Sequence, residues 1–215
     1  MTILSEFISR LPVEQREIVL GFHDPYDVQV YLDSLRYNAV IERDRSPLNV
    51  MREGVCHCLD GGLFAALALW GLGFQPLMLD LVPAPGMDDD HVLALFRVDG
   101  LWGAVAKGNF VGLRYREPIH RSLRELALSY FEAYFNNKRQ RTLRGYTRPF
   151  DLSRYKGQTW AWDEEATQTL YKRFYERKPI PLFPDAVAAR LRLLDERSFA
   201  GGTLGTDMEE TYPRK

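Results

Sequence analysis

Two cysteines flank a histidine at the point where the sequence becomes continuously apolar. The tripeptide Cys56-His57-Cys58 is followed by Asp60 and a pair of glycines, and then by residues 63–70, which include no polar side chain. This run is rich in Ala and Leu and poor in β-branched residues, so it predicts a helix that is buried on all sides. A thiol at the start of such a helix lies near free N–H groups and the positive end of the helix dipole, which lower its pKa. A thiolate held in this way is the nucleophile of cysteine-dependent enzymes.

The spacing favours Cys58 as the reactive thiol. It directly precedes the turn with Asp60, Gly61 and Gly62, where the missing Cβ atoms let a substrate come close. Cys56 stands in the approach to the helix, and we interpret it as a packed or lining thiol. The alternative for both is an inert role, because free cysteines are among the most buried side chains in proteins.

A hairpin downstream offers a base and an orienting group. His91 opens a predicted strand, Asp99-Gly100 is a strong turn signal, and residues 101–106 form the returning strand, with Asn109 just past its end. The hairpin folds His91 and Asn109 back toward each other. Together with Cys58 they form a nucleophile, base and orienter set.

The order of these residues resembles the transglutaminase-like superfamily, the cysteine-dependent branch related in fold to papain-type proteases. The resemblance covers roughly Gly54–Asn109, and the chain as a whole is most similar to a bacterial subgroup. It implies an α+β fold with a central buried helix packed on an antiparallel sheet, plus extra N- and C-terminal helices. The positions that fit the family pattern are Cys58, Gly62, Gly73, Pro76, His91 and Trp102.

The third catalytic position departs from the family. It is usually Asp, whereas here Asn109 is the nearest candidate and Lys107 stands about where the acid is expected. Papain-type enzymes do use Asn in this role. The resemblance also implies an upstream side chain that helps to hold an oxyanion, for which Asn38 or Tyr37 is the candidate, and Lys107 is a further candidate for contacting substrate.

The function expected on this basis is acyl transfer or hydrolysis. Cys58 attacks an amide or ester carbonyl of a peptide or small molecule, His91 shuttles the proton and Asn109 orients His91. The resulting thioester passes to water or to an amine. The alternative is a non-catalytic binding module on the same fold.

A third interpretation is a metal site. It would use both cysteines with His57 and His91, but one residue between two cysteines is not a usual zinc spacing. We therefore expect neither a metal nor another cofactor.

Composition places the protein among ordinary globular chains. Of 215 residues, 46% are hydrophobic and 27% charged, and the formal net charge of -1 does not favour nucleic acid or an anionic membrane as partner. The basic run at residues 138–141 is therefore interpreted as a solvated loop. Two cysteines one residue apart make a poor disulfide, the start lacks a signal-peptide pattern, and no apolar run reaches about 18 residues. A cytoplasmic location is expected.

The chain is predicted to form a single domain over residues 1–200. Its core spans about 46–115, with helical additions at 1–45 and 118–200, and residues 201–215 form a mobile tail. Cap residues mark five helix starts: Asp24, Ser46, Ser122, Asp163 and Asp185.

Overall fold

The protein is an α+β structure built on an antiparallel sheet. The computed structural model describes residues 2–38, 44–155, 157 and 159–212. Within them, one sheet has the strand order β6-β5-β4-β3-β7-β9, and β8 also pairs with β3. Its strands are β3 (Leu77–Pro83), β4 (His91–Val98), β5 (Leu101–Val105), β6 (Arg116–His120), β7 (Leu143–Tyr146), β8 (Phe150–Asp151) and β9 (Ile180–Pro181). A separate parallel pair joins β1 (Arg36–Tyr37) to β2 (Val55–Cys56).

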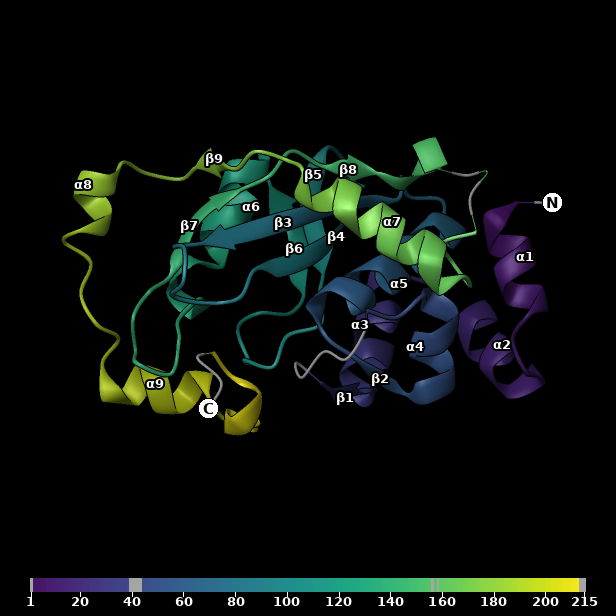
Figure 1. Ribbon diagram of the computed structural model, residues 1–215, viewed down its shortest axis with the longest axis horizontal. Coiled ribbons are helices and arrows are strands. Elements are labelled where there is room, and N and C mark those ends of the chain that lie inside the picture. Colours follow the sequence, from purple (N-terminus) through teal and green to yellow (C-terminus); the bar gives the residue numbers. More distant parts are fainter. Residues whose placement is uncertain (1, 39–43, 156, 158, 213–215) are drawn as a thin grey trace.

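Helix α5 (Cys58–Gly71) is the central helix, and it packs on β3 and β4. Every residue from Cys58 to Leu69 is buried, as the apolar run predicted. The N-terminal helices gather around α5 at one end of the molecule, whereas α8 (Asp185–Ala188) and α9 (Glu196–Gly202) lie at the other end (Figure 1). These N-terminal helices are α1 (Ile3–Ser9), α2 (Val13–Leu20), α3 (Pro25–Ser34) and α4 (Pro47–Glu53).

The sheet separates two hydrophobic cores. Side chains alternate between its faces because successive residues of a strand point in opposite directions. In β4, Val92, Ala94 and Phe96 belong to the core that contains α5. Leu93 and Leu95 belong to the second core, which is covered by α6 (Leu123–Ser129) and the short 3-10 helix η1 (Phe131–Ala133).

The hairpin predicted from Asp99-Gly100 is confirmed. Asp99 and Gly100 have φ of 50° and 83°, and Val98 pairs with Leu101 across the turn. Four of the five cap signals are confirmed as well: the side chains of Asp24, Ser46, Ser122 and Asp163 accept hydrogen bonds at the starts of α3, α4, α6 and α7 (Glu164–Tyr175). Asp185 does not cap a helix; it is the first residue of α8, which follows Pro184 and has no side-chain cap.

The C-terminal part differs from the expected helical addition and mobile tail. Residues 118–200 also supply strands β7, β8 and β9 to the main sheet. Beyond residue 200, α9 ends at Gly202 and a 3-10 helix, η3 (Met208–Glu210), follows. This segment is packed because the ring of Phe199 lies 5.6 Å from that of Phe135, and Thr211 is buried.

Among the described residues, no helix combines the length and the apolarity that crossing a membrane requires.

Candidate functional site

Cys58 is the first residue of α5, as the sequence predicted. His57 caps the helix: its Nδ1 accepts the Leu59 N–H at 3.2 Å, while Asp60 Oδ1 accepts the N–H of His57 at 2.7 Å. This reciprocal pair satisfies two N–H groups that a helix start leaves open. Because Nδ1 accepts a hydrogen bond, the hydrogen of the capping imidazole is placed on Nε2. Burial alone would lower the pKa of His57, but the hydrogen bond to Asp44 and the charge of Asp60 outweigh it and raise that pKa above its ordinary value.

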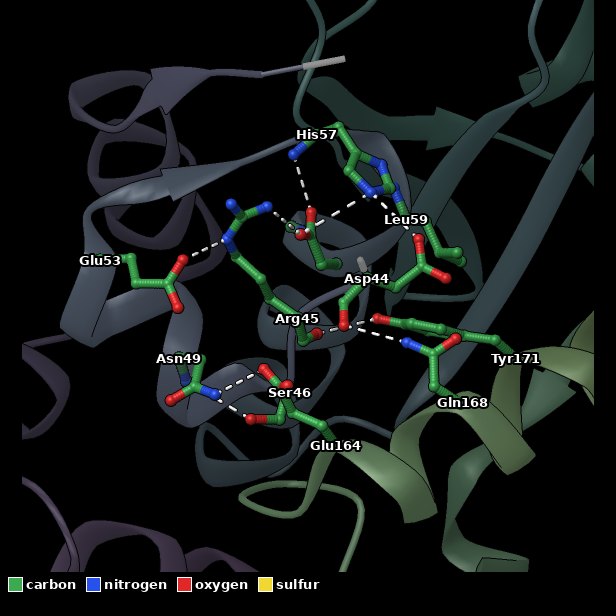
Figure 2. A network of polar contacts seen from close by, with 12 residues as sticks. Asp44, Arg45, Ser46, Asn49, Glu53, His57, Leu59, Glu164, Gln168 and Tyr171 are labelled. Atoms are coloured by element: carbon green, nitrogen blue, oxygen red, sulfur yellow. Dashed lines mark hydrogen bonds and ion pairs between the residues drawn. The ribbon is translucent and has the colours of Figure 1, made fainter. Parts of the chain in front are cut away.

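Carboxylates occupy the other side of His57 (Figure 2). Its Nε2 lies 3.3 Å from Asp44 Oδ1 and 3.7 Å from Asp60 Oδ2, and Arg45 Nη1 also lies 3.7 Å from Asp60 Oδ2. Helix α7 holds the same segment, since Tyr171 donates to the carbonyl of Arg45. His57 therefore anchors the chain before α4 to the start of α5.

The thiol of Cys58 is held by the backbone of β4. It donates to the carbonyl of Asp90 at 3.6 Å and accepts a hydrogen bond from the N–H of Val92. Burial, and then the negative charge of Asp90, raise the pKa of Cys58 well above its ordinary value, and the Val92 hydrogen bond offsets only part of this. The thiol is therefore protonated at neutral pH, although it stands at a helix N-terminus.

His91 points to the other face of the sheet. It pairs with Leu81 of β3, and its ring lies 6.2 Å from the ring of Tyr130 and 6.3 Å from the ring of Tyr134. Leu81, Tyr130 and Tyr134 all belong to the second core. Burial lowers its pKa to about 4, and the charge of Arg116 acts in the same direction. The structure thus does not bring the imidazole of His91 to the sulfur of Cys58.

Asn109 is engaged elsewhere. Its Nδ2 donates to the carbonyl of Asp207 at 2.8 Å, and its Oδ1 accepts the N–H of Asp207 at 3.1 Å. The hydroxyl of Thr206 also donates to the Asn109 carbonyl. Asn109 therefore fastens the C-terminal segment and, in this structure, does not orient the ring of His91.

Of the remaining candidates, Lys107 has a structural role. Its Nζ donates to the carbonyls of Leu32 at 2.7 Å and Leu35 at 2.5 Å, which satisfies the C-terminal end of α3. Tyr37 lies in β1 beside a cavity described below. Asn38 donates its N–H to the carbonyl of Cys56. Neither Tyr37 nor Asn38 contacts Cys58 through a hydrogen bond between described residues.

An acidic pair near Cys58 was not predicted from the sequence. Asp80 lies on the α5 face of β3, and its carboxyl forms a hydrogen bond with that of Asp90. Tyr175 of α7 donates to Asp90 Oδ2 at 2.8 Å. Burial, and then the charge of Asp90, raise the pKa of Asp80 well above its ordinary value, so the pair retains a shared proton. In the sequence, the signal that could have pointed to this pair was a single acid, Asp80, within the otherwise apolar strand 77–82.

A partly enclosed cavity of about 40 Å³ lies beside His91. The start of β4, Asn109 and the C-terminal residues 210–212 line it. Four acids contribute to its wall, namely Asp88, Asp89, Asp90 and Glu210, and none of the described residues lining it is Lys or Arg. The C-terminal residues 210–212 thus complete the wall of this recess.

No arrangement for a metal is present among the described residues: no three or more His, Cys, Asp or Glu side chains converge suitably. The four residues of the alternative metal interpretation, Cys56, His57, Cys58 and His91, are divided between the two faces of the sheet.

The fold and the site together define an α+β protein with a helix-terminal thiol and a separate acidic cavity. No family model matches the sequence, and no curated protein matches it.

Proposed function

We propose that this chain is a non-catalytic ligand-binding domain on a transglutaminase-like fold, with the cavity beside His91 as its site. Two features support the fold assignment. A cysteine opens a buried helix, and that helix packs on an antiparallel hairpin whose first residue is a histidine. These are the elements on which the resemblance rests.

The observation that carries the proposal is the separation of Cys58 from His91 by strand β4. A general base must come within hydrogen-bond reach of the proton that it removes, directly or through one water. The groups around the Cys58 sulfur are instead backbone atoms of β4 and the carboxyls of Asp90, Asp60 and Asp80. Negative charge and burial oppose formation of a thiolate, so the thiol lacks both means of activation.

Cysteine-dependent acyl transfer is the competing function, and it requires a different register of β4. Moving His91 to the α5 face would shift the strand by one residue and turn its apolar side chains away from their cores. Val92 would then lose its contact with Gly62. The two residues fit closely, because a Cβ added at Gly62 would lie only 2.9 Å from Val92 Cγ1. The close fit of Gly62 to Val92 favours the register observed.

Alkylation of the native protein with iodoacetamide tests the proposal. The rate at Cys58 is followed by mass spectrometry across neutral pH and compared with the rate in urea-unfolded protein. We expect labelling of the native thiol to be far slower than in the unfolded chain, and unchanged in His91→Gln. Selective labelling of Cys58 below about pH 7 that is lost in His91→Gln would overturn the proposal, because it requires a thiolate paired with an imidazole. The wild-type rate alone decides the matter if the variant fails to fold.

A further inference from the structure

A groove at the C-terminal end of α7 carries two arginines. It lies where α7 packs against β8 (Figure 1), and its volume is about 480 Å³. Arg173 belongs to the last turn of α7, and Arg177 follows one turn further along the chain, so both side chains reach the same groove. The other residues that line it are Phe150, Tyr155 and Glu176.

Aromatic rings hold both guanidinium groups in place. The Cζ of Arg177 lies 4.6 Å from the ring centroid of Phe150, and the Cζ of Arg173 lies 5.7 Å from that of Tyr155. The two rings are themselves stacked, with centroids 5.1 Å apart and 19° between their planes. Phe150 is only 1% exposed, and Tyr155 ends the 3-10 helix η2 (Leu152–Tyr155), so the platform is fixed to the core. A stacked guanidinium keeps its N–H groups at the edge of its plane, where they can donate to an anion.

Within the described part of the chain, neither guanidinium has a hydrogen-bond or ion-pair partner. The Nε of Arg177 is buried and unpartnered, whereas its two Nη groups, which form no hydrogen bond either, are open to solvent. Glu176 stands in the groove wall but forms no ion pair with Arg173 or Arg177. Arg141, by contrast, pairs with Glu132 at 2.8 Å. Two neighbouring positive charges without a counter-ion repel each other, and a bound anion would relieve this repulsion.

Stabilisation of α7 does not by itself account for the pair. A cation near the C-terminal end of a helix stabilises its dipole, and Lys172 shares that role with Arg173. The dipole requires only charge, and it requires neither an aromatic ring beneath each guanidinium nor a common groove. Lys172 is exposed and does not line the groove, so it serves below as a matched control.

The donors and the size of the groove select a phosphate group. One guanidinium matches a carboxylate, whereas a phosphate carries nearly two charges and three strong acceptor oxygens and can therefore engage two. A volume of about 480 Å³ is typical of small-molecule sites, so the groove has room for a phosphate and for an organic group attached to it.

We propose that this groove binds the phosphate group of a small molecule, with Arg173 and Arg177 donating to its oxygens. Free inorganic phosphate and a phosphate monoester share this chemistry. No described residue lines both this groove and the cavity beside His91, so the inference stands apart from the proposed function.

Nitrogen-15 NMR of the full chain tests the proposal at the Nε–H of Arg177. This group is buried, so its hydrogen is shielded from exchange with water, and its signal is assigned by its loss in Arg177→Lys. A ligand at the Nη groups also shifts Nε, because the guanidinium is one delocalised system. With sodium phosphate at neutral pH, we expect the signal to move and to saturate in the millimolar range. No movement, or equal movement with sodium chloride of the same ionic strength, overturns the inference.

A matched pair of variants tests the arginines. Arg173→Gln removes one positive charge from the groove, and Lys172→Gln removes the same charge from its exposed neighbour. We expect Arg173→Gln to weaken phosphate binding about fivefold, as for a partly exposed ion pair, and Lys172→Gln to leave it unchanged. The position of Arg173 on the surface protects the fold of this variant. Equal weakening in both variants would mean general electrostatic attraction and would overturn the assignment of the site.

The acid in the wall provides a test in the opposite direction. Glu176→Gln removes a charge that repels the phosphate, so we expect binding to tighten about threefold. Glu165→Gln removes an exposed acid near the start of α7, outside the groove, and should leave the affinity unchanged. Unchanged or weaker binding in Glu176→Gln would place the phosphate outside this groove and would overturn the assignment.

Three ligands distinguish the class and the source of the anion. Tighter binding of phenyl phosphate than of inorganic phosphate assigns an organic monoester to the groove, and equal or weaker binding assigns the free ion. Sodium acetate tests the class of anion. Acetate bound as tightly as phosphate would show a carboxylate site and would overturn the inference.

Discussion

Cys58 and His91 lie on opposite faces of strand β4, with the strand backbone between them. The thiol forms hydrogen bonds with the backbone groups of Asp90 and Val92, the residues on either side of His91 in the sequence. The imidazole packs instead against Tyr130 and Tyr134. Proximity along the backbone therefore does not place the two reactive groups within reach of each other, because side-chain direction in a strand is fixed by its alternation.

Asn109 is expected to hold the C-terminal segment. Asn109→Ala removes two hydrogen bonds to Asp207, so amide hydrogens of residues 207–212 should exchange roughly tenfold faster, in keeping with about 1–2 kcal/mol of lost local stability. Hydrogen exchange followed by mass spectrometry measures this. Asn109→Asp is the matched control, since it keeps the acceptor for the Asp207 N–H and should give an intermediate rate. An altered tautomer of His91 with unchanged exchange of the tail would instead mean that Asn109 orients the imidazole.

The Asp80–Asp90 pair predicts an unusual pH dependence of stability. Burial raises the pKa of Asp80 above the value of 3.8 that it has when unfolded. The folded state therefore binds more protons than the unfolded state above that pH. The stabilisation is complete below about pH 3.8 and is lost as the pH rises through the folded pKa.

Asp80→Asn is expected to remove most of the loss of stability that accompanies rising pH. The free energy of unfolding, from urea titrations at about pH 5 and about pH 8, should fall less with pH in the variant than in the wild type. Asp163→Asn is the control, because Asp163 is an exposed helix cap and Asn caps equally well. A pH dependence of Asp80→Asn equal to that of the wild type would show that Asp80 is ionised and solvated in the fold.

Two glycines of α5 are expected to respond in opposite ways to Ala. At Gly62 an added Cβ would lie 2.9 Å from Val92 Cγ1. This methyl cannot move away, because it belongs to a stiff β-branched side chain in a central strand. At Gly71 the added Cβ would lie 2.8 Å from a terminal methyl of Leu4, and this flexible side chain can turn away. We expect Gly62→Ala to destabilise the protein by about 1–3 kcal/mol. Gly71→Ala should be neutral or stabilising by up to about 1 kcal/mol, from its higher helix propensity. Urea denaturation compares them, and similar values for the two would contradict the packing of α5 on β4.

The local features of the fold were predictable because their determinants are local. The composition of residues 63–70 predicted α5, and Asp99-Gly100 predicted the β4–β5 turn. Cap residues such as Asp24 and Ser46 act within one turn of their helix, so their effect can be read from a few adjacent letters. The placement of Cys58 at the start of α5 belongs to the same class of inference.

The candidate site was less predictable because its geometry depends on distant partners. Asn109 binds Asp207, 98 residues away in sequence, and no short pattern announces that contact. Lys107 satisfies carbonyls at the end of α3, 72 and 75 residues before it. The acid Asp80 was visible in the sequence, but its partner Asp90 was identified only by the pairing of β3 with β4.

The sequence by itself determined that a thiol begins a buried helix and that a histidine begins the strand of a following hairpin. Only the tertiary structure decided that these two groups face different cores. The physical reason is the two-residue period of a strand, by which a shift of one residue exchanges the faces. The register is fixed by Val92 against Gly62 and by His91 opposite Leu81, contacts between segments that no local pattern relates.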